Sequence, residues 1–69
     1  DRNDIKHIHK VITGQSHGGG WWAEFYHNGS QRPVRSQSNM HASERHAILR
    51  LAPQLAALQI KHWDISKSG

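Results

Sequence analysis

The chain has 69 residues and a formal charge of +4, a length that fits one domain. It contains no cysteine, which excludes disulfides, thiolate metal sites and thiol nucleophiles. Such a chain buries only about 60% of the surface that its unfolded form exposes, so its core is thin. The pI of about 10.2 favours an acidic partner such as a nucleic acid. No apolar run is long enough to span a membrane, and the lack of cysteine fits a reducing compartment. We therefore expect a cytoplasmic or nucleoid-associated protein with no membrane partner.

The first expected element is a strand at residues 5–13, where β-branched residues dominate. Its alternation is imperfect, because each face of the strand carries both aliphatic and polar side chains. We expect Ile8 and Ile12 to face the core, with the stems of Lys6 and Lys10 along its rim. The opposite assignment, or a bulge that switches the two faces midway, is the alternative.

A glycine-rich segment at residues 14–20 follows, and we expect it to form an open loop. It is not a phosphate-binding loop, because the Gly-Lys-Ser/Thr ending is absent and no helical pattern comes after it. The segment therefore serves as a flexible connection to the second strand.

The pair Asn28-Gly29, between two strand-like runs, is the strongest hairpin signal in the chain. A loop of only these two residues would place Phe25 opposite Arg32. One face of this hairpin is apolar and is expected to be core: Trp21, Ala23, Phe25 and Val34. The other face is mixed and is expected to be exposed: Trp22, Glu24, Tyr26, Gln31, Pro33 and Arg35. Pro33 lacks an N–H, which favours an edge position for its strand and a central position for the strand before it.

A helix is expected after Ser43, whose hydroxyl can cap the first turn. Four apolar residues then recur at i, i+3, i+7 and i+10 and form one stripe: Ile48, Leu51, Leu55 and Leu58. Pro53 should kink this helix or begin a second short one. We expect the stripe to pack on the sheet, and a dimer seam is the alternative.

Residues 59–66 read as a short extended segment, either a fourth strand or a tail folded over the core. The ends, residues 1–4 and 66–69, are expected to be disordered. The predicted fold is thus a single α+β domain with a three-stranded antiparallel sheet and one C-terminal helix packed on one face. A short fourth strand stays open as an addition to this plan.

The exposed face of the predicted sheet is the candidate binding surface. Its aromatic, guanidinium and amide groups can stack on bases or read base edges. These groups belong to Trp22, Tyr26, Gln31 and Arg35. Lys6 and Lys10 on the neighbouring strand, with Arg32 at the rim, can neutralise phosphates. Two alternatives stay open: a Trp22–Arg35 cation–π pair that only stabilises the sheet, and a protein-interaction or self-assembly surface that includes a homodimer.

The run from Gly20 to Phe25 (Gly-Trp-Trp-Ala-Glu-Phe) is similar to the Trp-Ala-Glu-Ile of the plant ethylene-response-factor type of DNA-binding domain. The helix opening at Ala47-Ile48 is similar to the start of that family's helix. The same plan resembles the arm-binding domains of tyrosine recombinases. The resemblance implies that the sheet enters the major groove and that Trp22, Arg32 and Arg35 contact DNA. The first strand departs from those families, because it carries lysine and histidine in place of arginine.

Metal binding and catalysis have weaker signals. His7 and His9 lie on one side of a strand about 7 Å apart, and His62 or Asp64 could supply a third zinc or nickel ligand. Ser16-His17 could form a triad with a distant acid, as most chains with these residue types allow. We expect a non-enzymatic protein with no cofactor, no metal and no catalytic residue.

Overall fold

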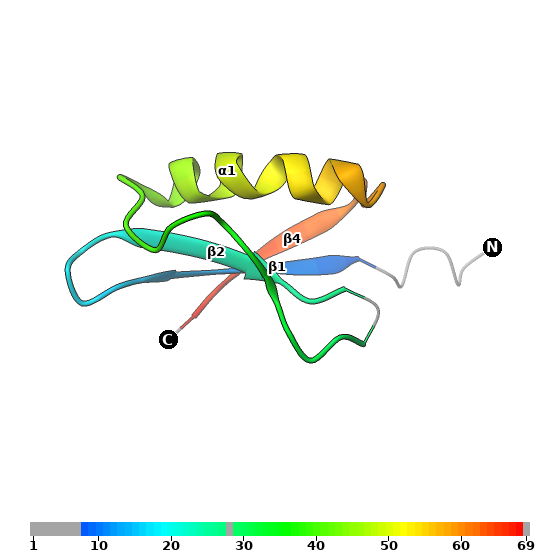
Figure 1. Ribbon diagram of the computed structural model, residues 1–69, viewed down its shortest axis with the longest axis horizontal. Coiled ribbons are helices and arrows are strands. Elements are labelled where there is room, and N and C mark those ends of the chain that lie inside the picture. Colours follow the sequence, from blue (N-terminus) through cyan, green and yellow to red (C-terminus); the bar gives the residue numbers. More distant parts are fainter. Residues whose placement is uncertain (1–7, 28, 69) are drawn as a thin grey trace.

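The computed structural model describes residues 8–27 and 29–68 (Figure 1). Its elements are β1 (His9–Gln15), β2 (Trp21–Phe25), β3 (Val34–Arg35), α1 (Glu44–Ala57) and β4 (Trp63–Lys67). The sheet order is β3-β2-β1-β4, antiparallel except for the parallel β1–β4 pair. The helix lies across one face of this sheet (Figure 1). The α+β plan is confirmed, and the C-terminal segment adds a fourth strand that makes the sheet mixed.

The core face of β1 differs from the prediction. Val11 pairs with Phe25 and Thr13 pairs with Ala23, and all four residues are fully buried beneath α1. Ile8 is 42% exposed. The expectation that Ile8 and Ile12 face the core is wrong, because the alternation that buries Val11 and Thr13 turns Ile12 to the opposite side.

Thr13 explains why the sequence pattern misleads. Its buried hydroxyl donates a hydrogen bond of 2.7 Å to Oε2 of Glu44 in the first turn of α1. A buried hydroxyl is costly unless it is hydrogen-bonded, and this bond to a charged acceptor removes that cost. Thr13 can therefore occupy a core position, although a prediction based on hydrophobicity places Ile12 in the core instead.

The hairpin register is shifted by two residues from the expected one. Phe25 pairs with Val34 and not with Arg32, and residues 26–33 form the connection. A turn does occur near the Asn28-Gly29 pair, since Ser30 N–H donates to His27 O at 3.0 Å and Gly29 has φ of 73°. Asn28 itself lies outside the described residues. A shift of two residues keeps the residues of β2 and β3 on their predicted faces, so the apolar face of the hairpin is core as expected. Tyr26, Gln31 and Pro33 were expected on the exposed face, but they lie in the connection.

The short β3 does not leave the rest of β2 unpaired. Ser36 N–H donates to Ala23 O at 2.8 Å, and Ser36 Oγ accepts from Ala23 N–H at 3.0 Å. Trp21 then exchanges two backbone hydrogen bonds with His41, at 2.9 and 3.1 Å. These contacts hold β2 in the centre of the sheet and β3 at the edge, as Pro33 predicts.

The helix begins as expected. Ser43 Oγ accepts from His46 N–H at 3.2 Å, which satisfies one free donor of the first turn. Leu51 and Leu55 are buried against β1 and β2 and Ile48 is partly buried there, so this part of the apolar stripe is core and not a dimer seam. Leu58 lies just past the end of α1 and is 41% exposed, so the expectation that it packs on the sheet is wrong. Pro53 lies inside one helix and does not begin a second.

The C-terminal end of α1 closes with a Schellman arrangement. Gln59 N–H donates to Ala56 O and Ile60 N–H donates to Leu55 O, both at 2.9 Å. Gln59 has φ of 60°, a left-handed conformation that usually selects glycine. Ile60 is buried beside Leu55, so the apolar contact typical of this motif is present.

The last strand extends further than predicted. β4 continues to Lys67, and Ser68 N–H donates to Thr13 O at 2.7 Å. The expectation of disorder is therefore wrong for residues 66–68, because this segment pairs with β1 in a parallel ladder. Residues 1–4 and Gly69 lie outside the described part of the chain. Within that part, no helix is long and apolar enough to cross a bilayer.

Candidate functional site

The face of the sheet opposite α1 is open to solvent. Strand alternation places on it the residues that lie between the buried positions of each strand. These are Lys10, Ile12 and Gly14 from β1, Trp22 and Glu24 from β2, Arg35 from β3, and Asp64 and Ser66 from β4. Three of the predicted binding residues, Lys10, Trp22 and Arg35, therefore share this open face.

The indole of Trp22 lies against the backbone of Gly14, its direct partner on β1. A Cβ atom at position 14 would come within 2.6 Å of Trp22 Cε2, which no side chain could tolerate without displacing the ring. Glycine inside a strand often marks a site where another group approaches closely. Gly14 thus provides the space in which Trp22 is seated.

Arg35 links Trp22 to an acidic neighbour. Its guanidinium carbon lies 5.1 Å from the centroid of the Trp22 ring, and its Nε lies 3.4 Å from Oε1 of Glu24. The Arg35 side chain is 51% exposed, whereas that of Glu24 is 14% exposed. The cation–π contact contributes about 0.5–1 kcal/mol at such a site. These two contacts hold the guanidinium on the sheet, while the Arg35 side chain as a whole stays half exposed to solvent.

The other predicted binding residues lie around this centre. Tyr26 is exposed just past the end of β2, and Gln31 and Arg32 are exposed within the connection of residues 26–33. That connection extends to the side of the sheet away from α1 (Figure 1). The structure therefore places Gln31 and Arg32 in a loop that flanks the open face and not on the face itself. Lys6 lies outside the described residues.

The charge of the open face is balanced. Lys10 and Arg35 are matched by Glu24 and Asp64, and Lys10 is the register partner of Asp64 on β4. The prediction missed Asp64 and Gly14 as parts of this surface. The parallel pairing of β4 decides the position of Asp64, and no local pattern reveals it. The sequence did contain a signal for Gly14: it directly follows a β-branched run, which indicates that it can belong to the same strand.

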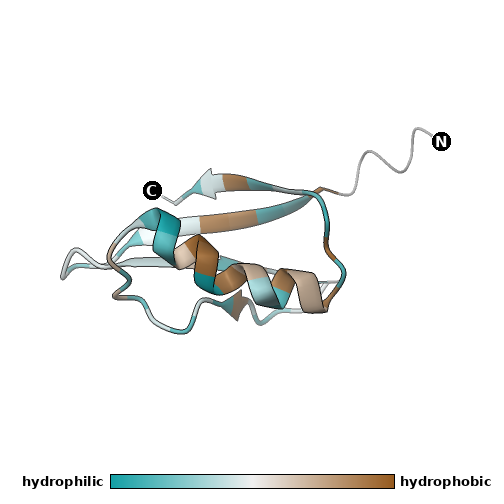
Figure 2. Cartoon of the chain, turned by 90° about the horizontal axis from the view of Figure 1, so that it is seen from above, coloured by the Kyte–Doolittle hydropathy of each residue, from teal (hydrophilic) through white to brown (hydrophobic). Residues whose placement is uncertain are grey.

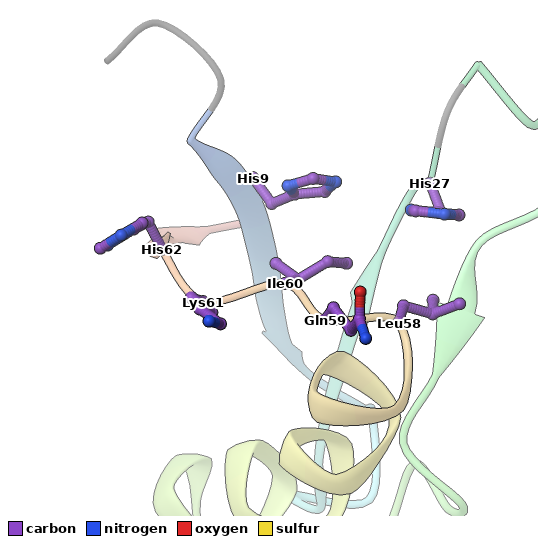
Figure 3. Close-up of a pocket in the computed structure, with 7 residues that line it drawn as sticks. All are labelled: His9, His27, Leu58, Gln59, Ile60, Lys61 and His62. Atoms are coloured by element: carbon purple, nitrogen blue, oxygen red, sulfur yellow. The ribbon is translucent and has the colours of Figure 1, made fainter. Parts of the chain in front are cut away.

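A hollow of about 310 Å³ lies at the C-terminal end of α1 (Figure 3). His9 and His27 face each other across it, with ring centroids 5.8 Å apart and an interplanar angle of 22°. Its wall is formed by residues 58–62, and the ring of His62 points away from the hollow (Figure 3).

These positions bear on the proposed metal ligands. His9 faces the helix side of the sheet, whereas Asp64 faces the open side. His7 lies outside the described residues. Among residues 8–27 and 29–68, no group of three or more histidine, cysteine, aspartate or glutamate side chains could hold a metal ion.

Comparison of the chain with protein-family models, with curated proteins and with solved structures finds no match in any of the three. The resemblance to sheet-plus-helix DNA-binding domains therefore stays a prediction. The function has to be inferred from the surface itself.

Proposed function

We propose that this chain is a small non-enzymatic nucleic-acid-binding module that uses the open face of its sheet. One observation carries the proposal: the Arg35 guanidinium is held by Trp22 and Glu24, and yet the Arg35 side chain is 51% exposed to solvent. A fixed guanidinium has lost much of its rotational freedom before binding, so less entropy is lost when it contacts a phosphate or a guanine edge.

Three basic side chains supply the electrostatic part of this binding. Lys10 and Arg35 are exposed on the open face, and Arg32 is exposed in the loop that flanks it. Each phosphate that they neutralise releases counterions, which makes the affinity depend steeply on salt. Tyr26 is exposed directly after the C-terminal end of β2, where the loop that carries Arg32 begins, and it offers a ring on which a base can stack.

A second candidate function is a protein-interaction surface on the same face. The observation that favours it is the charge balance, since Glu24 and Asp64 offset Lys10 and Arg35 there. An acidic side chain repels phosphate but pairs readily with a basic group on a protein partner. The two candidates differ in their salt dependence, which is much steeper for a nucleic acid.

The proposal is tested with Arg35→Ala against Arg50→Ala, which removes the same charge from an exposed position on α1. Binding of fluorescently labelled duplex and single-stranded oligonucleotides is measured by anisotropy at several salt concentrations. We expect Arg35→Ala to weaken binding roughly tenfold, a loss of about 1.4 kcal/mol. The slope of log K against log salt should also become shallower by about 0.9 for one lost phosphate contact.

Arg50→Ala should change the affinity only slightly. Equal losses in the two variants would mean that general charge, and not the open face, drives binding. Undetectable binding of the native chain at low salt would remove nucleic acid as the partner. Amide spectra recorded with the same oligonucleotides locate the contact, and we expect shifts at the Trp22 indole and the Arg35 backbone that fade as salt rises.

A further inference from the structure

We propose that two copies of this chain associate through the outer edge of β4, as a twofold-symmetric antiparallel pair centred on Ile65. The proposal does not rest on the proposed function, because it concerns a different part of the molecule. It follows from the unpaired backbone of β4, from an apolar side chain that α1 leaves uncovered, and from the way in which this strand complements itself.

The two edges of the sheet are built differently. The β3 edge has only two residues, and Pro33 precedes it without an N–H to donate. The β4 edge has five residues, and no strand within residues 8–27 and 29–68 pairs with its outer side. An unpaired strand of this kind is a template for pairing with another chain.

The hydrogen bonds to β1 show which backbone groups are available. His9 N–H donates to His62 O, and Ser68 N–H donates to Thr13 O. The even-numbered residues of this segment thus direct their backbone groups toward β1. Because successive residues of a strand alternate, the backbone groups of Trp63, Ile65 and Lys67 are directed toward the outer edge. The middle residue of the strand, Ile65, is therefore the natural centre of a new ladder.

The side chains on the helix side of β4 are incompletely covered. Figure 2 shows β4 lying clear of α1. Ile65 points to this side, as the register partner of the buried Val11, yet it is 48% exposed. Trp63 also points there and is partly buried against the core. A second copy placed at this edge would cover Ile65 with an identical isoleucine.

Charge and shape select one register. Centred on Ile65, the pairing places Ile65 opposite Ile65, Trp63 opposite Lys67, and Asp64 opposite Ser66 of the second copy. This register pairs the whole strand, and it lets an ammonium lie beside an indole. A shift by two residues in one direction would oppose two Asp64 carboxylates, and a shift in the other direction would oppose Ile65 to Lys67. The first shift brings like charges together and the second loses the apolar contact.

The twofold axis of such a pair is perpendicular to the sheet. Both helices then lie on one side, and the two open faces join into one continuous surface on the other. The contact involves a five-residue strand and is small, so we expect a dimer that forms and dissociates with protein concentration.

Sedimentation velocity over a range of concentrations, without nucleic acid, tests the dimer directly. Ile65→Lys is compared with Leu49→Lys, an exposed position on α1 that is also apolar (59% exposed). We expect the native chain and Leu49→Lys to dimerise alike, and Ile65→Lys to raise the dissociation constant roughly tenfold or more, because a buried charge replaces the isoleucine contact. A native chain that stays monomeric at every concentration would overturn the proposal, as would equal effects of the two variants.

Cross-linking tests the register and does not depend on the stability of a charged variant. The chain has no cysteine, so single cysteines can be introduced cleanly. In the proposed register two copies of Ile65→Cys have Cα atoms about 5.5 Å apart, within disulfide range. Two copies of Ser66→Cys are offset diagonally, beyond the roughly 7 Å that a disulfide spans. Rapid oxidation of Ile65→Cys alone to a covalent dimer supports the pairing, whereas equal or faster cross-linking of Ser66→Cys would refute it.

Discussion

The two faces of the sheet arise from one alternation of the same strands, but they are stabilised in different ways. The face beneath α1 is closed by burial, with Val11, Ala23 and Phe25 fully covered by the helix. The open face is held by local contacts, in which Trp22 lies over Gly14 and Arg35 joins Trp22 to Glu24. The first arrangement excludes water, and the second leaves the Arg35 side chain half exposed.

This difference teaches where stability and function can be separated. In a chain of this length the total free energy of unfolding is about 3–10 kcal/mol, so one core residue carries a large part of it. The contacts of the open face contribute about 1 kcal/mol or less each. Side chains on the open face can therefore be changed without unfolding the protein, so their effect on binding can be measured separately from their effect on stability.

The largest expected effect concerns the closed face. Leu51→Ala removes a fully buried side chain and should lower the free energy of unfolding by about 2–5 kcal/mol, through lost burial and a cavity. Leu49→Ala, two residues earlier on α1, removes the same atoms from a position that is 59% exposed, and it should cost less than about 0.5 kcal/mol. Urea denaturation followed by circular dichroism measures both. Similar losses would mean that α1 does not pack on the sheet through this stripe.

An intermediate effect on stability is expected where the Trp22 indole contacts Gly14. Gly14→Ala should lower the free energy of unfolding by about 1–3 kcal/mol, because the new methyl group collides with the indole. In a Trp22→Ala background the collision is absent, and the same change should then be neutral or slightly stabilising. The difference between the two backgrounds, from a double-mutant cycle, gives the coupling between these residues. A coupling near zero would show that the ring does not rest on Gly14.

The smallest expected effect lies at the end of α1, where the closed face meets the His9–His27 hollow. Gln59 adopts a left-handed conformation, so Gln59→Gly should raise the free energy of unfolding by about 0.5–1 kcal/mol. The thermal midpoint should rise accordingly, since each kcal/mol is worth roughly 4–8 °C in a domain of this size. Loss of stability in this variant would mean that the Gln59 side chain makes contacts that outweigh the strain of its backbone.

The sequence by itself determined much of this protein. The Ser43 cap and the apolar stripe after it define α1, because capping and helical periodicity are local properties. Pro33 indicated the edge strand, since a residue without an N–H cannot complete a central ladder. The faces of the residues that lie in β2 and β3 were also predicted, and they survived a register error because that error was an even number of residues.

Tertiary structure decided the rest. Whether Val11 or Ile12 faces the core depends on pairing with β2 and on the Thr13–Glu44 hydrogen bond, which joins residues far apart in the chain. The parallel docking of β4 places Asp64 on the open face and leaves Ile65 at the edge, and it depends on where α1 ends. Nonlocal pairing of this kind is set by the packing of whole elements, so the local patterns of the sequence do not encode it in a readable form.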